Sequence, residues 1–228
     1  MQTKTNKGLE VREGRTYLKA PHLDGEINFV YPAKGSGNYI DVAEELKKDN
    51  LSQPTMSQNA SLIYSAWQNP KEKYSKEVIN TLGEFGLWCF NGILCAKEGA
   101  YIKDNPEIKN GRVSMNEKDL LSKLESSESS VRFVPYGYKV GKQSAKELAK
   151  NKFVQALAGE EGADKLAETS SNYQFEPHLF SLENPDKELI RVASLGGGRG
   201  RIDGGLLVLG LGSDVSWGGH VFGVSEAS

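Results

Sequence analysis

Two loops of this chain combine glycine with positively charged side chains, a combination that suits the binding of an anion. The first loop ends at Ser144, which has capping-box spacing to Glu147 and therefore predicts a helix start. The free amides and the positive dipole end of a helix start favour a phosphate. The side chains of this loop that could bind it are Tyr136, Tyr138, Lys139, Lys142 and Ser144.

The surroundings of this first loop are strongly basic. Residues 131–155 carry six positive charges and one negative charge, a net of +5, whereas residues 156–190 carry eight acids and two lysines, a net of −6. An alternative to ligand binding is therefore a solvated basic helix face with an ordinary cap, attracted to the acidic segment or to another subunit. The gap from Gly137 to Gly141 is also too short for a Walker A phosphate loop.

The second loop, 196–205, has five glycines in its first part and at its end, with an Arg-Gly-Arg sequence between them. Its candidate ligand-binding side chains are Arg199 and Arg201, which could clamp a phosphate or a carboxylate, and Asp203 is a further candidate. The third glycine of a dinucleotide-binding motif is missing, and Leu206–Leu211 reads as a strand instead of a helix. The alternative is a mobile connection between two strands.

The two loops together favour a protein that binds a phosphate-bearing ligand, either a nucleotide or a nucleic acid. Tyr136 and Tyr138 could stack on a base. If the protein has one functional site, the loops 137–144 and 196–205 should line the same pocket, because neither alone supplies enough positive groups to surround an anion. A net charge of −2 and an isoelectric point of about 6.0 exclude general electrostatic affinity for nucleic acid and limit any such contact to one site.

Two other classes of function stay open. The glycine-rich C-terminal region has few charges after Asp203 and suits strand addition or subunit contact, so the protein could be a non-catalytic interaction protein that forms a homo-oligomer. A hydrolase could use His220, which closely follows Ser213, Asp214 and Ser216, although no Gly-x-Ser-x-Gly motif occurs. The sequence does not decide whether the protein is an enzyme, and it indicates no cofactor.

Metal ligands, disulfides and membrane segments are not expected. The three histidines neither pair at helical spacing nor adjoin a cysteine, which argues against a zinc site. Cys89 and Cys95 lie in apolar surroundings typical of buried thiols in a reducing compartment. The N-terminus has no apolar signal segment, and the longest apolar stretch, Leu206–Leu211, is far short of the ~20 residues of a membrane helix. We therefore expect a cytoplasmic protein with no membrane partner.

The elements that would position these loops predict a fold of the α+β class. We expect a flexible polar tail over residues 1–15 and a single domain over 16–228. Regular alternation of strand and helix is absent, so the first three quarters are predicted to be mostly helical with a few strands, followed by a glycine-rich antiparallel β region. Helices are predicted near Asp41, Thr55, Ser75, Ser114 and Ser144 from their caps and apolar spacing.

One segment is predicted to form the most buried helix. Residues 85–94 continue the apolar stripe of the helix that begins at Ser75 and contain one polar side chain, Asn91. A hairpin should follow, with residues 97–99 as its turn. The predicted core residues are Trp67, Leu82, Phe85, Trp88, Ile93, Phe133 and Leu148.

Overall fold

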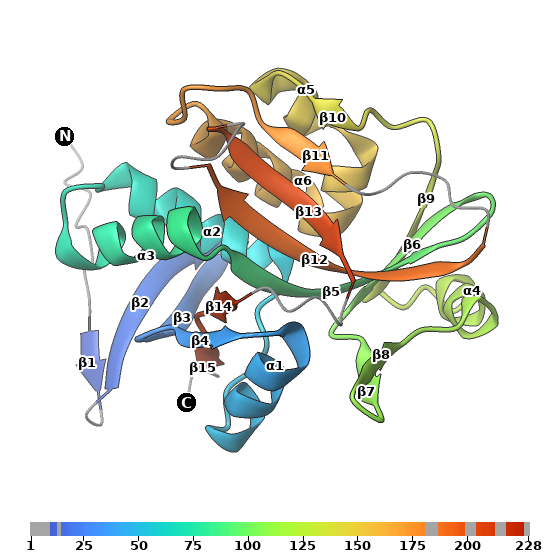
Figure 1. Ribbon diagram of the computed structural model, residues 1–228, viewed down its shortest axis with the longest axis horizontal. Helices are drawn as coiled ribbons and strands as arrows, with labels where there is room; N and C mark the ends of the chain where they lie inside the picture. Colours follow the sequence, from blue (N-terminus) through green and yellow to red (C-terminus); the bar gives the residue numbers. More distant parts are fainter. Residues whose placement is uncertain (1–9, 13–14, 181–186, 199–203, 213–217, 226–228) are drawn as a thin grey trace.

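The computed structural model describes residues 10–12, 15–180, 187–198, 204–212 and 218–225. Helix and strand each make up about 36% of the described residues, and Figure 1 shows how they are arranged. The described strands form one sheet of nine strands, one of four and one of two. The prediction of a mostly helical chain with its β region at the C-terminus is therefore wrong, because the largest sheet takes strands from the whole length of the sequence.

The large sheet is built around β5 (Leu87–Cys95), in which every residue is buried. One side of β5 pairs antiparallel with β12 (Leu189–Gly197), and the other side pairs with β6 (Gly99–Asp104) and β14 (Gly219–Val221). The sheet continues outward through β13 (Leu206–Leu211), β11 (His178–Phe180) and β10 (Gly141–Lys142) beyond β12, through β9 (Val131–Pro135) beyond β6, and through β4 (Lys34–Gly37) beyond β14.

The segment predicted as the most buried helix is this central strand. A short stretch that is apolar on all sides fits a strand buried on both faces as well as a buried helix, so periodicity cannot separate the two. The preceding helix, α3 (Lys73–Glu84), is followed at Gly86 by a φ of 76°, which lies in the left-handed region that glycine favours after a helix. The hairpin that was predicted after this segment is confirmed, and it joins β5 to β6.

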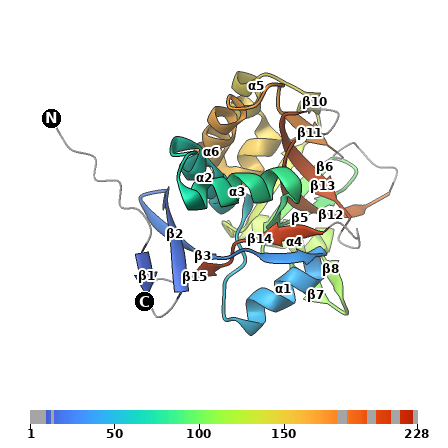
Figure 2. The same ribbon diagram turned by 60° about the vertical axis from the view of Figure 1, so that its left-hand side comes forward.

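Helices cover both faces of the large sheet. On one face α2 (Met56–Gln68) packs between α3 and α6 (Lys152–Ser170), and α5 (Ala145–Lys150) packs on α6 (Figure 2). The principal core lies between these helices and the sheet and includes Leu87 and Cys89 of β5. Trp88 and Phe90 point to the opposite face and form a second core with α1 (Tyr39–Lys48). A third cluster lies under α4 (Glu117–Glu125).

A smaller sheet joins the two ends of the described chain. β15 (Val224–Ser225) pairs with β3 (Gly25–Tyr31), which pairs in turn with β2 (Arg15–His22). β1 (Glu10–Arg12), which pairs with β2, lies within the segment predicted as a flexible tail. The hairpin of β7 (Glu107–Lys109) and β8 (Arg112–Ser114) forms the sheet of two strands.

Local helix-start signals were the most accurate part of the sequence prediction. The capping boxes of Thr55 with Gln58 and of Ser144 with Glu147 are both present. The third predicted box is wrong, because Asn116, and not Ser114, caps α4. Of the predicted core residues, Leu82, Trp88, Ile93 and Leu148 are buried, Trp67 is partly buried, and Phe85 and Phe133 are 41% and 37% exposed.

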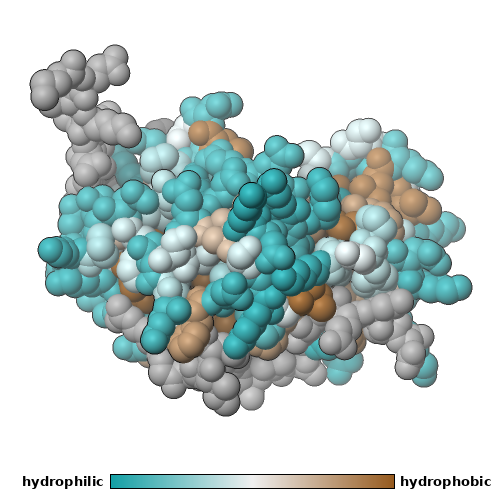
Figure 3. Space-filling model, turned by 90° about the horizontal axis from the view of Figure 1, so that it is seen from above, coloured by the Kyte–Doolittle hydropathy of each residue, from teal (hydrophilic) through white to brown (hydrophobic). Residues whose placement is uncertain are grey.

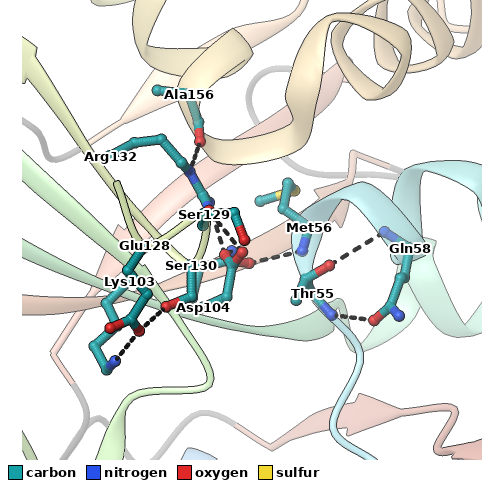
Figure 4. A network of polar contacts seen from close by, with 11 residues as sticks. Thr55, Met56, Gln58, Lys103, Asp104, Glu128, Ser129, Ser130, Arg132 and Ala156 are labelled. Atoms are coloured by element: carbon teal, nitrogen blue, oxygen red, sulfur yellow. Dashed lines mark hydrogen bonds and ion pairs between the residues drawn. The ribbon is translucent and has the colours of Figure 1, made fainter. Parts of the chain in front are cut away.

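A polar network ties the central strand to two helices and to the edge of the sheet (Figure 4). The Asn91 Oδ1 accepts a hydrogen bond from the Met56 N–H at 2.7 Å, and the Asn91 Nδ2 donates to Asp104 at 2.6 Å. Asp104 accepts from both terminal nitrogens of Arg132 at 2.5 and 2.6 Å, and the Arg132 Nε donates to the Ala156 carbonyl at 2.7 Å. Met56 is the first residue of α2, so its N–H has no partner within the helix and depends on Asn91.

Replacing Asn91 with leucine should lower the free energy of unfolding by about 2–4 kcal/mol. The change leaves the Met56 N–H buried without a partner and removes a donor from Asp104, and each such loss costs ~1–3 kcal/mol. Urea unfolding followed by circular dichroism measures it. The exposed Asn172, replaced by alanine, serves as the control and should shift the value by less than about 0.5 kcal/mol. Wild-type stability of Asn91→Leu would contradict the role given to this amide.

Candidate functional site

The predicted anion site at the start of α5 is filled by the protein's own side chains. The Ser144 N–H donates to the Glu147 carboxylate at 2.7 Å, and the Ser144 Oγ accepts from the Glu147 N–H at 3.3 Å. The Lys139 Nζ forms an ion pair with the same carboxylate at 2.8 Å. Lys139, with the Ser144 amide, lowers the pKa of Glu147 to about 2. Glu147 therefore takes the position that a phosphate would need, and the structure gives phosphate binding no support here.

The two tyrosines of this loop are half-buried and held by the fold. The Tyr136 hydroxyl donates to the Ala96 carbonyl at 2.8 Å, and burial raises the pKa of Tyr136 to about 12. The Tyr138 ring packs on Phe153 with 4.8 Å between ring centroids, and burial raises its pKa as well. Neither hydroxyl is ionised at neutral pH.

Only the ends of the second loop can be placed. Arg199, Arg201 and Asp203 lie outside the described residues. The Gly198 N–H donates to the Gly205 carbonyl at 2.9 Å and closes the base of the connection from β12 to β13.

The register of the large sheet relates this base to the first loop. It places Lys142, His178, Leu207 and Gly196 in one row across β10, β11, β13 and β12, which spans about 14 Å at ~4.8 Å per strand. Lys142 thus lies at the end of the sheet where β12 ends. That the two loops line one pocket stays a prediction.

His220 lies in β14 against an aromatic ring. Its ring centroid is 4.4 Å from that of Phe85, and the backbone N–H of His220 donates to the Gly86 carbonyl at 3.1 Å. The Nδ1 is buried and finds no hydrogen-bond partner among the described residues. Ser213, Asp214 and Ser216 fall outside them, so a hydrolytic role for His220 stays a prediction.

Cysteine chemistry and metal binding gain no support from the residues that can be placed. Cys89 and Cys95 are free and buried, and burial raises the pKa of Cys89 to about 12. Within the described ranges, no three His, Cys, Asp or Glu side chains gather closely enough to hold a metal ion.

None of the described helices combines the length and apolar character that crossing a membrane requires.

A groove beside β9 contains two of the predicted ligand-binding residues, Tyr136 and Tyr138, but the sequence did not predict the groove itself. Its volume is about 660 Å³. Leu124 of α4 lines one side, Lys152 and Ala156 of α6 line the other, and β9 runs between them. Apolar side chains gather toward the end of the molecule that carries β6 and β9 (Figure 3). The lining also includes Val131, Arg132, Phe133, Val134, Pro135, Tyr136, Gly137 and Tyr138.

The groove follows a strand edge that is open in the described chain. β9 pairs with β6 and with no other described strand. The bonds from the Asp104 N–H to the Ser130 carbonyl and from the Tyr136 N–H to the Glu98 carbonyl fix the alternation of this antiparallel pair. By that alternation, the backbone groups of Arg132 and Val134 face β6. The backbone groups of Val131, Phe133 and Pro135 face the groove.

Three residues of β9 therefore present backbone groups to the groove. Phe133 presents both its N–H and its carbonyl. Val131 presents only its carbonyl, because its N–H donates to the Glu128 carbonyl at 3.1 Å. Pro135 has no N–H. Since proline within a strand is largely confined to edges, Pro135 was the sequence signal that could have located this edge.

Replacing His220 with glutamine should flatten the loss of stability on acidification. Burial lowers the pKa of His220 below its ordinary value of 6.5, so the unfolded state binds the proton more readily and the folded state loses stability as the pH falls below 6.5. Thermal melts at pH 7.5 and pH 5.5 measure the slope. His22, whose pKa is also lowered by burial, keeps part of the slope in the variant. Identical slopes for the wild type and the variant would contradict the buried, neutral state of His220.

Comparison with known proteins relates this chain to one fold and to no family. No family model matches it, and a search of the curated proteins finds no match. Among solved structures, it is similar to a Nanoarchaeota protein whose C-type lectin fold is described as accommodating massive sequence variation. The TM-score is 0.54 at 15% sequence identity, and the match covers 85% of this chain and 97% of that chain. At this identity the similarity shows a shared fold alone, and that fold replaces the predicted helical architecture.

Proposed function

We propose that this protein is a binding protein that takes a ligand into the groove beside β9. The observation that carries the proposal is an open cavity of about 660 Å³ lined by aromatic and aliphatic side chains. Ligand sites in proteins are typically concave and apolar with a few fixed polar groups. Phe133, which is 37% exposed in this lining, gains most from being covered.

The polar groups of the groove suit recognition better than catalysis. Arg132 is held by Asp104 and by the Ala156 carbonyl, and the hydroxyl of Tyr136 donates to the Ala96 carbonyl. With a pKa of about 12, Tyr136 stays protonated at neutral pH and is a poor general base. Among the described lining residues, no nucleophile stands beside a base.

The structural similarity supports a binding role through the fold. The C-type lectin fold is described as accommodating massive sequence variation in Nanoarchaeota, and a fold can do so when buried contacts supply its stability and surface residues are free to change. The same separation holds in this chain, where Trp88 and Phe90 of β5 are fully buried while Phe133 and Pro135 at the groove are exposed. The interaction hypothesis from the sequence is thus retained, with its surface moved from the C-terminal β region to β9.

Replacing Phe133 with alanine should weaken ligand binding roughly tenfold, which corresponds to about 1.4 kcal/mol. Ligands are selected on the wild-type protein from displayed random peptides and from an array of immobilised glycans, and binding is then measured by calorimetry. Phe85→Ala is the matched control. Phe85 is 41% exposed and packs on His220 at 4.4 Å, much as Phe133 packs on Tyr101 at 4.7 Å, but it does not line the groove.

The control should bind as tightly as the wild type. If no selected peptide or glycan loses affinity with Phe133→Ala, or if both variants lose it equally, the groove is not the binding site and the proposed function fails.

A further inference from the structure

Resting on the proposed function, we infer that the occupant of the groove is an extended acidic peptide segment that adds to the large sheet as a strand beside β9. Four features of the described residues carry this inference: the backbone groups at the edge, the walls of the groove, the charges around it and the fixed position of β9.

The backbone of β9 provides a template for strand addition. Phe133 offers an N–H and a carbonyl toward the groove, and the carbonyls of Val131 and Pro135 extend the row of acceptors. Recognition by strand addition uses main-chain hydrogen bonds for affinity and alternate side chains for specificity. A ligand without amide donors, such as a glycan, would not match this row in spacing or direction.

The walls of the groove match the alternation of an added strand. Successive side chains of a strand point to opposite faces of the sheet. On one face, Leu124 and the Phe133 ring would contact apolar side chains of the peptide. On the other face, Ala156 and Lys152 line the groove, and an acidic side chain of the peptide would pair with Lys152.

Charge favours an acidic peptide. Lys152 is exposed, and its Nζ donates a long hydrogen bond of 3.4 Å to the Gln155 Oε1. Lys146 and Lys150 of the adjoining helix α5 are also exposed, and residues 131–155 carry a net charge of +5. Two acids of the neighbouring segments are already engaged, because Glu147 pairs with Lys139 and Glu128 pairs with Lys123 and Lys103. Arg132 is neutralised by Asp104 and adds no free charge.

The same charge argues against a second copy of this chain as the occupant. Pairing β9 with β9 of another copy would bring two basic segments together, with the two Lys152 side chains near the shared edge. Like charges on edge strands are a common protection against self-association.

The edge is also fixed before any ligand arrives. Arg132 of β9 is anchored to β6 through Asp104 and to α6 through the Ala156 carbonyl. A preorganised strand lowers the cost of binding, since only the peptide has to be ordered.

The test uses a fluorescein-labelled peptide of alternating glutamate and valine, with an alternating lysine and valine peptide as its control. The Glu-Val peptide should bind, and the Lys-Val peptide should bind at least about tenfold more weakly. Two further Glu-Val peptides carry N-methyl groups on alternate backbone amides, one on each set. Only the set that faces β9 should abolish binding, because the other set points away from the sheet edge.

Protein variants separate the backbone from the side chains. Phe133→Pro removes the N–H and should weaken the Glu-Val peptide beyond the loss seen with Phe133→Ala, which keeps it. Lys152→Glu should weaken the Glu-Val peptide by about threefold or more and improve binding of the Lys-Val peptide. Hydrogen exchange on the wild-type protein should show new protection of the Phe133 amide when the Glu-Val peptide is added, a readout that needs no variant.

The two proposals fail in different ways. Binding of the Glu-Val peptide that is equal for both methylated sets, or absent while a glycan or another peptide binds in a Phe133-dependent way, overturns strand addition and leaves the proposed function standing. The absence of any ligand that depends on Phe133 overturns both.

Discussion

The amide of Asn91, in the middle of the buried strand β5, is the constraint on which the rest of the fold depends. A buried amide is costly unless its donors and acceptor are all satisfied. Its oxygen holds the first N–H of α2, and its nitrogen holds Asp104 at the end of β6. Asp104 in turn holds Arg132 of the edge strand β9. The position of the groove is therefore set from the core outward, through a chain of hydrogen bonds that begins at one side chain.

The elements that sequence could predict are those whose causes are local. The capping boxes at Thr55 and Ser144 act within four residues, and both helices begin there. The strand β5 could not be predicted, because a run of apolar residues suits a buried helix equally and only pairing with β12, about a hundred residues later, makes it a strand. A local signal against a continuous helix was Gly86, which follows the end of α3.

The candidate site shows the same division between local and distant causes. The sequence identifies the basic residues near Ser144, but it does not show which of them already form an ion pair. In the structure, Lys139 pairs with Glu147. The capping box that predicted the helix also occupies an amide at its start, because the Ser144 N–H donates to the Glu147 carboxylate. In contrast, the groove depends on α4, α6 and β9 meeting at one edge, which no local pattern encodes.

An open strand edge must resist self-association and still accept a partner, and β9 has the means for both. Pro135 withholds a donor and Lys152 places a positive charge in the groove, which are usual protections of an edge. Phe133, between them, keeps a complete pair of backbone groups and an exposed ring. A strand edge that is covered by another element excludes every added strand. A strand edge that is protected by positive charge excludes only positively charged strands. Under the proposed strand addition, an edge guarded in this way excludes a second copy of the protein and accepts an acidic strand.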